Sequence, residues 1–403
     1  MTLKKIFNDP VHGFISMHHP ILLEIIDHPF FQRLRRISQL GLTNYVYPGA
    51  NHTRFHHALG ALRLMKMAIP TLRDKGNQIP EEEEIASCIG ILLHDIGHGP
   101  YSHALENPII KGVSHEEISI LMMDELNRQF DGKLTLAIEI FKDQYHKRFL
   151  HSLISGQLDV DRLDYLTRDS FFTGVNEGVI SHDRILKMLD VYDGKLVVEQ
   201  KGIYSIESFL ISRRLMYWQV YLHKTVLCAE MMLIKAMERA KELAKKGVEL
   251  PCTDALRYFL YNDFSIMNFT GNTLEMFAQL DDNDVLSALK YWKNHRDPIL
   301  AYLSNALLNR NLFLIRQIES NRNDLKLQEQ KVSNSFGCKI EDASFLVFDL
   351  TIRHAAYDIQ HDKILIISKD NSVKDIVEAS DFTYLKDLGV PVSKTYRFEY
   401  QIN

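Results

Sequence analysis

The stretch Ile91-Leu92-Leu93-His94-Asp95-Ile96-Gly97-His98-Gly99-Pro100 changes abruptly from apolar to ionisable residues. It follows Pro80 and the four glutamates 81–84, a typical helix start, because proline needs no donor there and carboxylates favour the positive end of the helix dipole. Residues 85–93 are apolar on nearly every side, so we expect a buried helix that ends near His94.

The His94-Asp95 pair needs a partner at the end of such a helix. An ionised carboxylate is costly to bury, and a metal ion is a partner that both a carboxylate and an imidazole can bind. The simpler interpretation is a capping aspartate beside a core histidine, which would be preferred for an isolated pair. Other clusters of ionisable residues in the chain favour the metal site.

Length and composition limit the class of protein. The 403 residues, 46% of them hydrophobic, predict one large body and a smaller lobe. The net charge of −5 argues against general affinity for nucleic acids or membrane surfaces. The start lacks the apolar core of a signal peptide and no apolar run is long enough to span a bilayer, so we expect a cytoplasmic protein. Four scattered cysteines indicate neither a disulfide framework nor a zinc ribbon.

Residues 51–60 form a second cluster, with three imidazoles and an arginine ahead of a helix predicted from Ala61 to Ala68. His56 and His57 are neighbours about 100° apart on a helix, so they cannot both bind one ion. The residues alone do not decide which of the two points inward.

Residues 156–169 form a third cluster, in which aspartates and arginines alternate with apolar residues. A salt-bridged surface helix is one interpretation of this pattern. Because apolar residues lie on every side, we expect some of the carboxylates to be buried with partners.

Further elements follow from local patterns. A hairpin is predicted over 195–204 around residues 200–202, and one long helix from about Ser205 to Lys246 that stops at Gly247. Residues 281–284 read as a turn and cap within further helices. Strand-like runs at 345–352, 363–367 and 395–400 predict a small α+β lobe over residues 321–403.

The ordered set of a histidine, a histidine-aspartate doublet and a distant aspartate resembles the HD superfamily of metal-dependent phosphohydrolases. The resemblance implies a mainly α fold, with an HD-domain helical body over residues 1–320. It implies one divalent ion, for which two imidazoles and two carboxylates suit Fe, Mn, Zn or Ni better than Mg. The ligands it assigns are His57, His94, Asp95 and Asp161.

A longer series of motifs, between residues 4 and 318, is similar to the deoxynucleoside triphosphate triphosphohydrolases that in animals carry a sterile alpha motif ahead of the HD domain. We expect no such motif ahead of the HD region here, because the similar part begins at about residue 4. The similar segments are Asn8-Asp9-Pro10-Val11-His12-Gly13, Phe31-Gln32-Arg33-Leu34-Arg35, Tyr47-Pro48-Gly49-Ala50, Arg54-Phe55, the stretch from His94 to His103, His115-Glu116 and the stretch from Asp159 to Tyr165. This likeness implies hydrolysis of deoxynucleoside triphosphates to a deoxynucleoside and inorganic triphosphate, Mg²⁺ accompanying the nucleotide, and a homodimer or homotetramer.

The same likeness assigns roles to individual residues. Arg162 stands where relatives often have lysine, and a guanidinium can still neutralise phosphate oxygens. His103, tuned by Glu106, is expected to protonate the departing 5′-oxygen, with His98 and His115 as alternatives. The triphosphate contacts are Arg54, Arg162 and Arg213, the sugar contacts are Gln39, Tyr165, Asp169 and Tyr221, and the groups around the α-phosphate are His98, His103, Glu106 and His115.

A second nucleotide site is implied as well. Trp218, Gln219 and Leu222 depart from the family pattern around His223-Lys224. Arg33 and Arg36 are interpreted as a solvated basic face. The residues assigned to a guanine nucleotide effector are Lys5, Asp27, Gln32, Arg35, His223 and Lys224.

Two other functions fit part of this pattern. One is an HD hydrolase of another nucleotide or phosphomonoester, since the metal ligands are shared by all such enzymes. The other is a nucleotide-binding regulatory protein without turnover. Release of tripolyphosphate would distinguish the first, and retention of nucleotide without product would favour the second.

Overall fold

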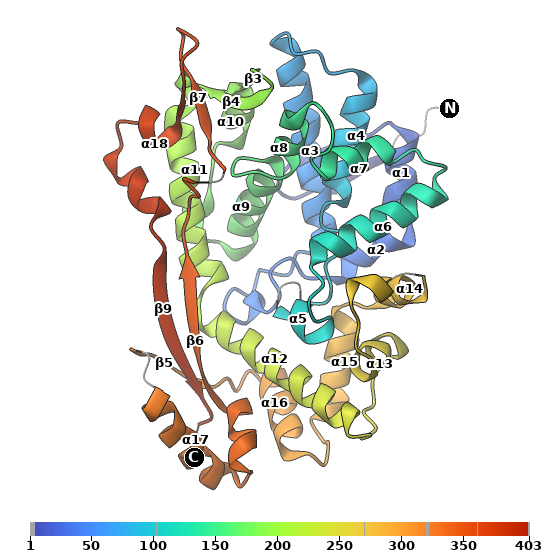
Figure 1. Cartoon of the computed structure of the whole chain (residues 1–403), viewed down its shortest axis with the longest axis vertical. Helices are drawn as coiled ribbons and strands as arrows, with labels where there is room; N and C mark the ends of the chain where they lie inside the picture. Colours follow the sequence, from blue (N-terminus) through green and yellow to red (C-terminus); the bar gives the residue numbers. More distant parts are fainter. Residues whose placement is uncertain (1–4, 102–103, 270, 320–321, 361, 402–403) are drawn as a thin grey trace.

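The computed structural model describes residues 5–101, 104–269, 271–319, 322–360 and 362–401, and the described chain is mainly helical (Figure 1). The chain begins with an antiparallel hairpin of β1 (Lys5–Asp9) and β2 (Gly13–Met17). Two short helices follow, α1 (Pro20–Asp27) and α2 (Pro29–Gln32), each with proline in its first turn, where no backbone donor is needed.

The helical body is built around α3 (Arg54–Asp74), which packs on α4 (Glu81–Leu93) and α9 (Val160–Thr173). α4 is buried along most of its second half, as its apolar sequence predicts. α3 begins at Arg54, earlier than the predicted Ala61, because Thr53 and the His56 side chain form a capping box. The other helices of this part are α5 (Glu106–Ile109), α6 (His115–Gln129), α7 (Thr135–Phe141), α8 (Arg148–Ile154) and α10 (His182–Met188).

The predicted long helix is in fact two. α11 (Ile203–Met216) passes into a π-helical turn at Tyr217–Tyr221, and α12 (Lys224–Lys245) starts afresh. The Leu222 N–H donates to the Tyr217 carbonyl at 2.7 Å, which is the wider π spacing. The His223 backbone is extended and its ring accepts from the Thr225 N–H, so a new N-cap forms. Helical periodicity continues across such an interruption, which is why the sequence did not indicate it.

The predicted hairpin is shifted. β3 (Leu189–Tyr192) pairs antiparallel with β4 (Lys195–Glu199), and the turn is Asp193-Gly194, both at positive φ. Residues 203 and 204 are the start of α11, not a strand. An Asp-Gly pair with positive φ at both positions matches the twist of the strands, so the turn forms there.

The remaining helices lie on α12 and on one another, and α12 packs on α16. The predicted cap at residues 281–284 is confirmed, since Asp281 and Asp284 form a capping box at the start of α15. These helices are α13 (Asp254–Tyr261), α14 (Asn272–Gln279), α15 (Asp282–Trp292) and α16 (Pro298–Leu308).

The C-terminal part contributes strands to two sheets. β6 and β9 form a long antiparallel ribbon beside α11, with β5 on the outer edge of β9 (Figure 1). β7 pairs parallel with β4, so the early hairpin and the C-terminal chain share a sheet. The division at residue 320 stays a prediction. The elements are β5 (Leu314–Gln317), α17 (Arg322–Phe336), β6 (Val347–His354), β7 (Leu365–Ile367), β8 (Val373–Asp375), α18 (Ile376–Ala379) and β9 (Val392–Glu399).

Within the described residues, every helix is too short or too polar to cross a lipid bilayer.

Candidate metal centre and its cavity

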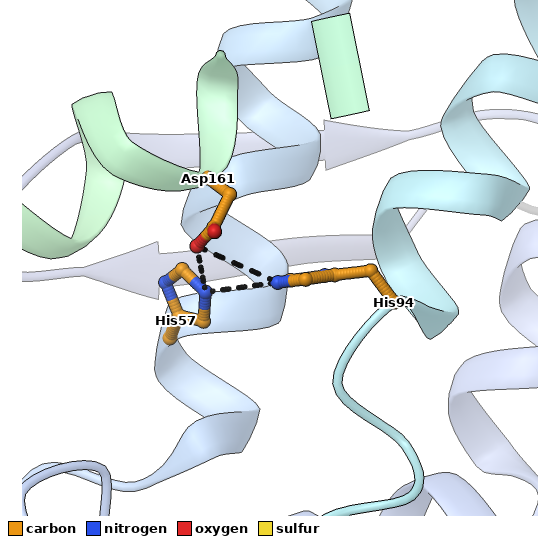
Figure 2. A group of neighbouring side chains, drawn as sticks. All are labelled: His57, His94 and Asp161. Atoms are coloured by element: carbon orange, nitrogen blue, oxygen red, sulfur yellow. Dashed lines mark hydrogen bonds and ion pairs between the residues drawn. The ribbon is translucent and has the colours of Figure 1, made fainter. Parts of the chain in front are cut away.

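Three side chains from three helices converge at the centre of the body (Figure 2). His57 comes from the first turn of α3, His94 follows the last residue of α4, and Asp161 lies in the first turn of α9. His57 Nε2 lies 3.0 Å from Asp161 Oδ1 and 3.3 Å from His94 Nε2, and His94 Nε2 lies 3.5 Å from Asp161 Oδ1. His57, which the sequence could not separate from His56, is the one that points inward.

The hydrogen bonds behind the two imidazoles orient them as ligands. His94 Nδ1 lies 2.7 Å from the Ile91 carbonyl, which can only accept, so the proton of a neutral ring sits on Nδ1. His57 Nδ1 lies 2.8 Å from the Asp164 carboxylate, a second acceptor. Both Nε2 lone pairs then face each other and the Asp161 carboxylate, an arrangement that a cation satisfies. The residues therefore fit a divalent metal ion.

The electrostatics of this centre agree with a cation site. Burial disfavours the charged form of His57, but the hydrogen bonds with Asp161 and Asp164 outweigh it and raise the pKa of His57 to about 10. Burial alone would raise the pKa of Asp161, and the two imidazoles hold it well below the usual range. The site thus attracts positive charge, as a proton or as a metal ion that competes with it.

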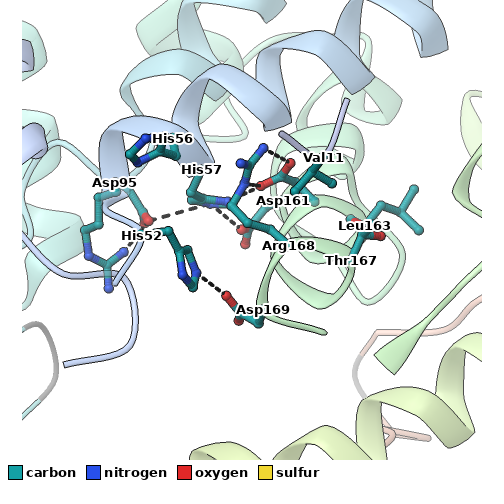
Figure 3. Close-up of polar contacts among 12 residues, drawn as sticks. Val11, His52, His56, His57, Asp95, Asp161, Leu163, Thr167, Arg168 and Asp169 are labelled. Atoms are coloured by element: carbon teal, nitrogen blue, oxygen red, sulfur yellow. Dashed lines mark hydrogen bonds and ion pairs between the residues drawn. The ribbon is translucent and has the colours of Figure 1, made fainter. Parts of the chain in front are cut away.

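Asp95, the fourth expected ligand, lies beside the triad but faces an arginine (Figure 3). Its Oδ1 is 3.4 Å from His94 Nε2 and 3.3 Å from His98 Nε2, its Oδ2 is 3.8 Å from His57 Nε2, and Arg54 donates to it. Burial opposes ionisation, yet Arg54 and the two neighbouring histidines at 94 and 98 keep the pKa of Asp95 well below its usual range. Its role as a ligand stays a prediction.

A cavity of about 440 Å³ opens beside the triad, large enough for a small-molecule ligand. Arg213 does not line the cavity. Its guanidinium lies 5.9 Å from the ring of Tyr217, and Tyr217 is a lining residue. The lining residues that the sequence had singled out are Gln39, Arg54, Asp95, His98, His115, Asp161, Arg162, Tyr165, Asp169 and Tyr221.

Two polar atoms on the cavity wall are buried without a hydrogen-bond partner among the described residues, Gln39 Oε1 and the Tyr165 hydroxyl. Nearby, Asp169 accepts from the Tyr221 hydroxyl at 2.8 Å and lies 2.7 Å from His52 Nε2 (Figure 3). Buried polar groups are almost always paired, so the two open atoms indicate that this wall receives a polar ligand.

The histidines near the triad are stacked. The His98 and His115 rings lie 3.9 Å apart and nearly parallel, and His115 Nδ1 is 3.2 Å from Glu106. Burial lowers the pKa of His98 well below the usual range, so its ring is neutral. His103, the expected general acid, lies outside the described residues.

Comparison with known proteins decides the family. A model of the HD domain matches residues 54–169, and a model of the HD-associated region matches residues 180–258. The crystal structure of a phosphohydrolase from Bacteroides thetaiotaomicron is 52% identical with a TM-score of 0.95, over 99% of this chain and 100% of that one. The chain belongs to the HD-domain phosphohydrolase family.

Other relatives of this HD phosphohydrolase are more distant. The uncharacterized protein YwfO of Bacillus subtilis is 35% identical over 333 residues, which cover 80% of this chain and 74% of that protein. Mouse SAMHD1, a deoxynucleoside triphosphate triphosphohydrolase, is 29% identical over 371 residues, which cover 78% of this chain and 54% of that protein. The chain thus spans about half the length of SAMHD1.

The HD phosphohydrolase holds His57 through a buried charged network that the sequence analysis did not assemble. Asp164 Oδ1 lies 2.7 Å from His12 Nε2, and Arg168 donates to Asp164 at 2.9 Å and to Asp9 at 2.8 Å. A Cβ on Gly60 would lie 2.0 Å from Asp164 Oδ1, so only glycine fits at that point of α3. The glycine directly before a predicted helix and the Asp-Arg pair four residues apart were the available signals.

The arginine-rich segment is not a uniform solvated face. Arg33 is fully buried, and both its terminal nitrogens donate to the His98 carbonyl at 2.8 Å. Arg36 is partly exposed and pairs with Asp281. The prediction was therefore wrong for Arg33, since spacing along a helix does not show that a loop carbonyl approaches from residue 98.

The expected effector residues fall into two groups. Lys5 pairs with Asp27 at 2.7 Å, and Arg35 donates to Gln32 at 2.9 Å. The Phe7 and Phe55 rings, 6.4 Å apart, join the two pairs, because Lys5 lies over Phe7 and Arg35 over Phe55. The other group is His223 and Lys224 at the start of α12, where Lys224 lines a different cavity.

The C-terminal part of the chain contacts a lining residue of the cavity beside the triad. The His354 ring, at the end of β6, stacks on Tyr217 with 3.8 Å between ring centroids. Gln157 donates to the carbonyls of Asp358 and Asp362 and accepts from the Asp358 N–H at 3.0 Å. The segment ahead of α9 and the segment after β6 are therefore bound to each other.

Proposed function

We propose that this HD phosphohydrolase hydrolyses deoxynucleoside triphosphates to a deoxynucleoside and inorganic triphosphate, using one divalent metal ion. The observation that carries the proposal is the convergence of His57, His94 and Asp161 on the edge of a cavity lined by two arginines and two unpaired polar atoms. The name of SAMHD1, a deoxynucleoside triphosphate triphosphohydrolase, supports the choice of substrate.

The phosphate end of the substrate is assigned to the arginines. Arg54 and Arg162 line the cavity, and Arg213 lies behind Tyr217. Arg162 Nε pairs with Asp159 at 3.2 Å, and this ion pair fixes the orientation of the guanidinium group. Guanidinium groups neutralise phosphate oxygens and can hold two of them at once.

The sugar end is assigned to the unpaired wall. Gln39 Oε1 is free to accept a 3′-hydroxyl, and Asp169, fixed by His52 and Tyr221, has further lone pairs for it. The Tyr165 ring against C2′ would leave no room for the hydroxyl of a ribose. A deoxyribose therefore fits the proposal better than a ribose.

The metal would be held by His57, His94 and Asp161, with Asp95 beside them. When bound, such an ion supplies Lewis acidity toward water and phosphate oxygen. Arg54 and Arg162 stabilise the charge that develops on the phosphate. His103, with Glu106 in the same segment, is proposed to give its proton to the 5′-oxygen, and His115 and the neutral His98 ring pack beside the α-phosphate.

We place the second nucleotide site at the group of expected effector residues in the N-terminal part of the chain, Lys5, Asp27, Gln32 and Arg35. Asp27 accepts hydrogen bonds from the N1–H and the N2 amino group of guanine, and Arg35 contacts its phosphate, with Lys5 and Gln32 beside them. His223 and Lys224 would complete the site from another copy in a homodimer or homotetramer.

The test is incubation of the purified protein with each deoxynucleoside triphosphate, singly and in mixtures, with metal analysis of the same sample. We expect tripolyphosphate and deoxynucleoside as products, and turnover in mixtures containing a guanine nucleotide that exceeds the sum of the single reactions. Orthophosphate as the product would instead identify a different HD hydrolase, and tight nucleotide binding with no product would identify a regulatory protein.

A further inference from the structure

The cavity has a second chemical end, formed by α12 and the loop after Gln39. Leu227 and Glu230, one turn apart on α12, line it together with Leu40 and Gly41. A Cβ on Gly41 would lie 3.3 Å from Glu230 Oε1, so the carboxyl group rests directly against this backbone. Gly41 follows closely after Gln39, which places Glu230 next to the proposed sugar contact.

Glu230 differs from the other carboxylates of the cavity. Asp95, Asp161 and Asp169 each have a cationic or hydrogen-bonding partner, whereas Glu230 has none among the described residues. Burial raises the pKa of Glu230 to about 8, with no contribution from a neighbouring charge. The carboxyl group is therefore neutral at pH 7.

A neutral carboxylic acid presents one donor and one acceptor side by side. The hydrogen-bonding edge of each natural base also offers a donor beside an acceptor, such as the amino group and N1 of adenine or the N3–H and O4 of thymine. The acid can exchange its two oxygens by rotation, so it can pair with either order. A half-buried carboxyl without a protein partner is only partly solvated, and a ligand edge of this kind would satisfy it.

We propose that Glu230 is a substrate-recognition residue that pairs with the base edge of the bound deoxynucleotide, accepting all bases that carry an adjacent donor and acceptor. The proposal rests on the proposed function, because it uses the sugar and phosphate assignments to direct the base toward α12. Leu40 and Leu227 supply the apolar walls on either side.

The experiment measures kcat/KM for dATP and for a deoxynucleoside triphosphate whose base is unsubstituted purine, which keeps N1 but has no amino group. We expect the wild-type protein to favour dATP by about tenfold, the effect of losing one hydrogen bond to a buried group. Glu230→Gln keeps a donor and an acceptor and should retain this preference. Glu230→Leu should lose it, with the change mainly in KM.

Glu238→Leu, on the same helix and more exposed, is the matched control and should behave as wild type. A dATP preference retained in Glu230→Leu would overturn the assignment, as would equal losses with both substrates, which would mean a role in holding Gly41 alone. Direct binding of both nucleotides to all four proteins separates the two proposals. Binding that shows the same preference without turnover leaves Glu230 supported and the proposed function refuted, and absence of binding refutes both.

Discussion

The two histidines of the candidate metal centre are held in opposite ways. His57 is hydrogen-bonded to Asp164, which also contacts His12 and Arg168. Arg168 extends the network to Asp9 in the N-terminal hairpin. The His94 ring is hydrogen-bonded to a backbone carbonyl of α4, and the backbone carbonyl of His94 accepts from the Ser119 hydroxyl at 2.9 Å. One imidazole depends on charges brought from distant parts of the chain, the other on a local helix end.

The His57 side and the His94 side should therefore respond to different substitutions. A buried charge cluster is stable only when every member has its partner, and loss of one leaves another charge unpaired. A backbone carbonyl cannot be removed by substitution, so the His94 side can be loosened only through its second contacts. Substitutions on the two sides should therefore differ in how much metal the protein loses.

Asp161 belongs to both sides, because it faces both imidazoles. Asp161→Asn removes the negative charge between them, and we expect loss of the bound metal and a fall in turnover greater than the roughly 100-fold caused by losing an outer partner of a ligand. Metal analysis and product release measure this, and circular dichroism should show an intact fold. A variant that keeps stoichiometric metal would remove the basis of the proposed centre.

Asp164→Asn tests the His57 side. The amide leaves Arg168 and His57 without their shared carboxylate, so metal affinity should fall by about 10- to 100-fold and the melting temperature should drop. Titration against a competing chelator gives the affinity. Asp183→Asn, an exposed aspartate next to a histidine on α10, is the control and should change neither quantity.

Asp9→Asn acts one contact further from the metal. Its expected effect on metal affinity is severalfold, smaller than that of Asp164→Asn, while the melting temperature falls clearly because Arg168 stays buried. The double variant Asp9→Asn/Asp164→Asn should lose less metal affinity than the two single variants lose in sum, since both substitutions act through one network. Additive losses of metal affinity would show that Asp9 acts independently of Asp164.

Ser119→Ala tests the His94 side. It removes the hydrogen bond to the His94 carbonyl and the one accepted from the Gly97 N–H, with a stability loss of about 1–3 kcal/mol. Metal affinity should change by less than about threefold, because the Ile91 carbonyl still orients the ring. A loss of metal as large as for Asp164→Asn would erase the contrast between the two sides.

The helical class, the core helix before His94 and the strands after residue 340 could be predicted because each has a strong local pattern. The choice between His56 and His57 could not, since it depends on where α9 packs. The break after Met216 was missed because helical periodicity continues across it. The burial of Arg33 was missed because it depends on a distant backbone group, the His98 carbonyl. His52, Gly60 and Glu230 gained meaning only when their neighbours across the cavity or helix interface were known.

The link between Gln157 and the loop at residues 358–362 has a practical consequence. A shortened protein ending near residue 320 would lack the chain that ties down the lead-in to α9, together with the ring that covers Tyr217. Such a fragment would be a poor substitute for the whole enzyme in assays or inhibitor screening, even though every metal-facing side chain would still be present.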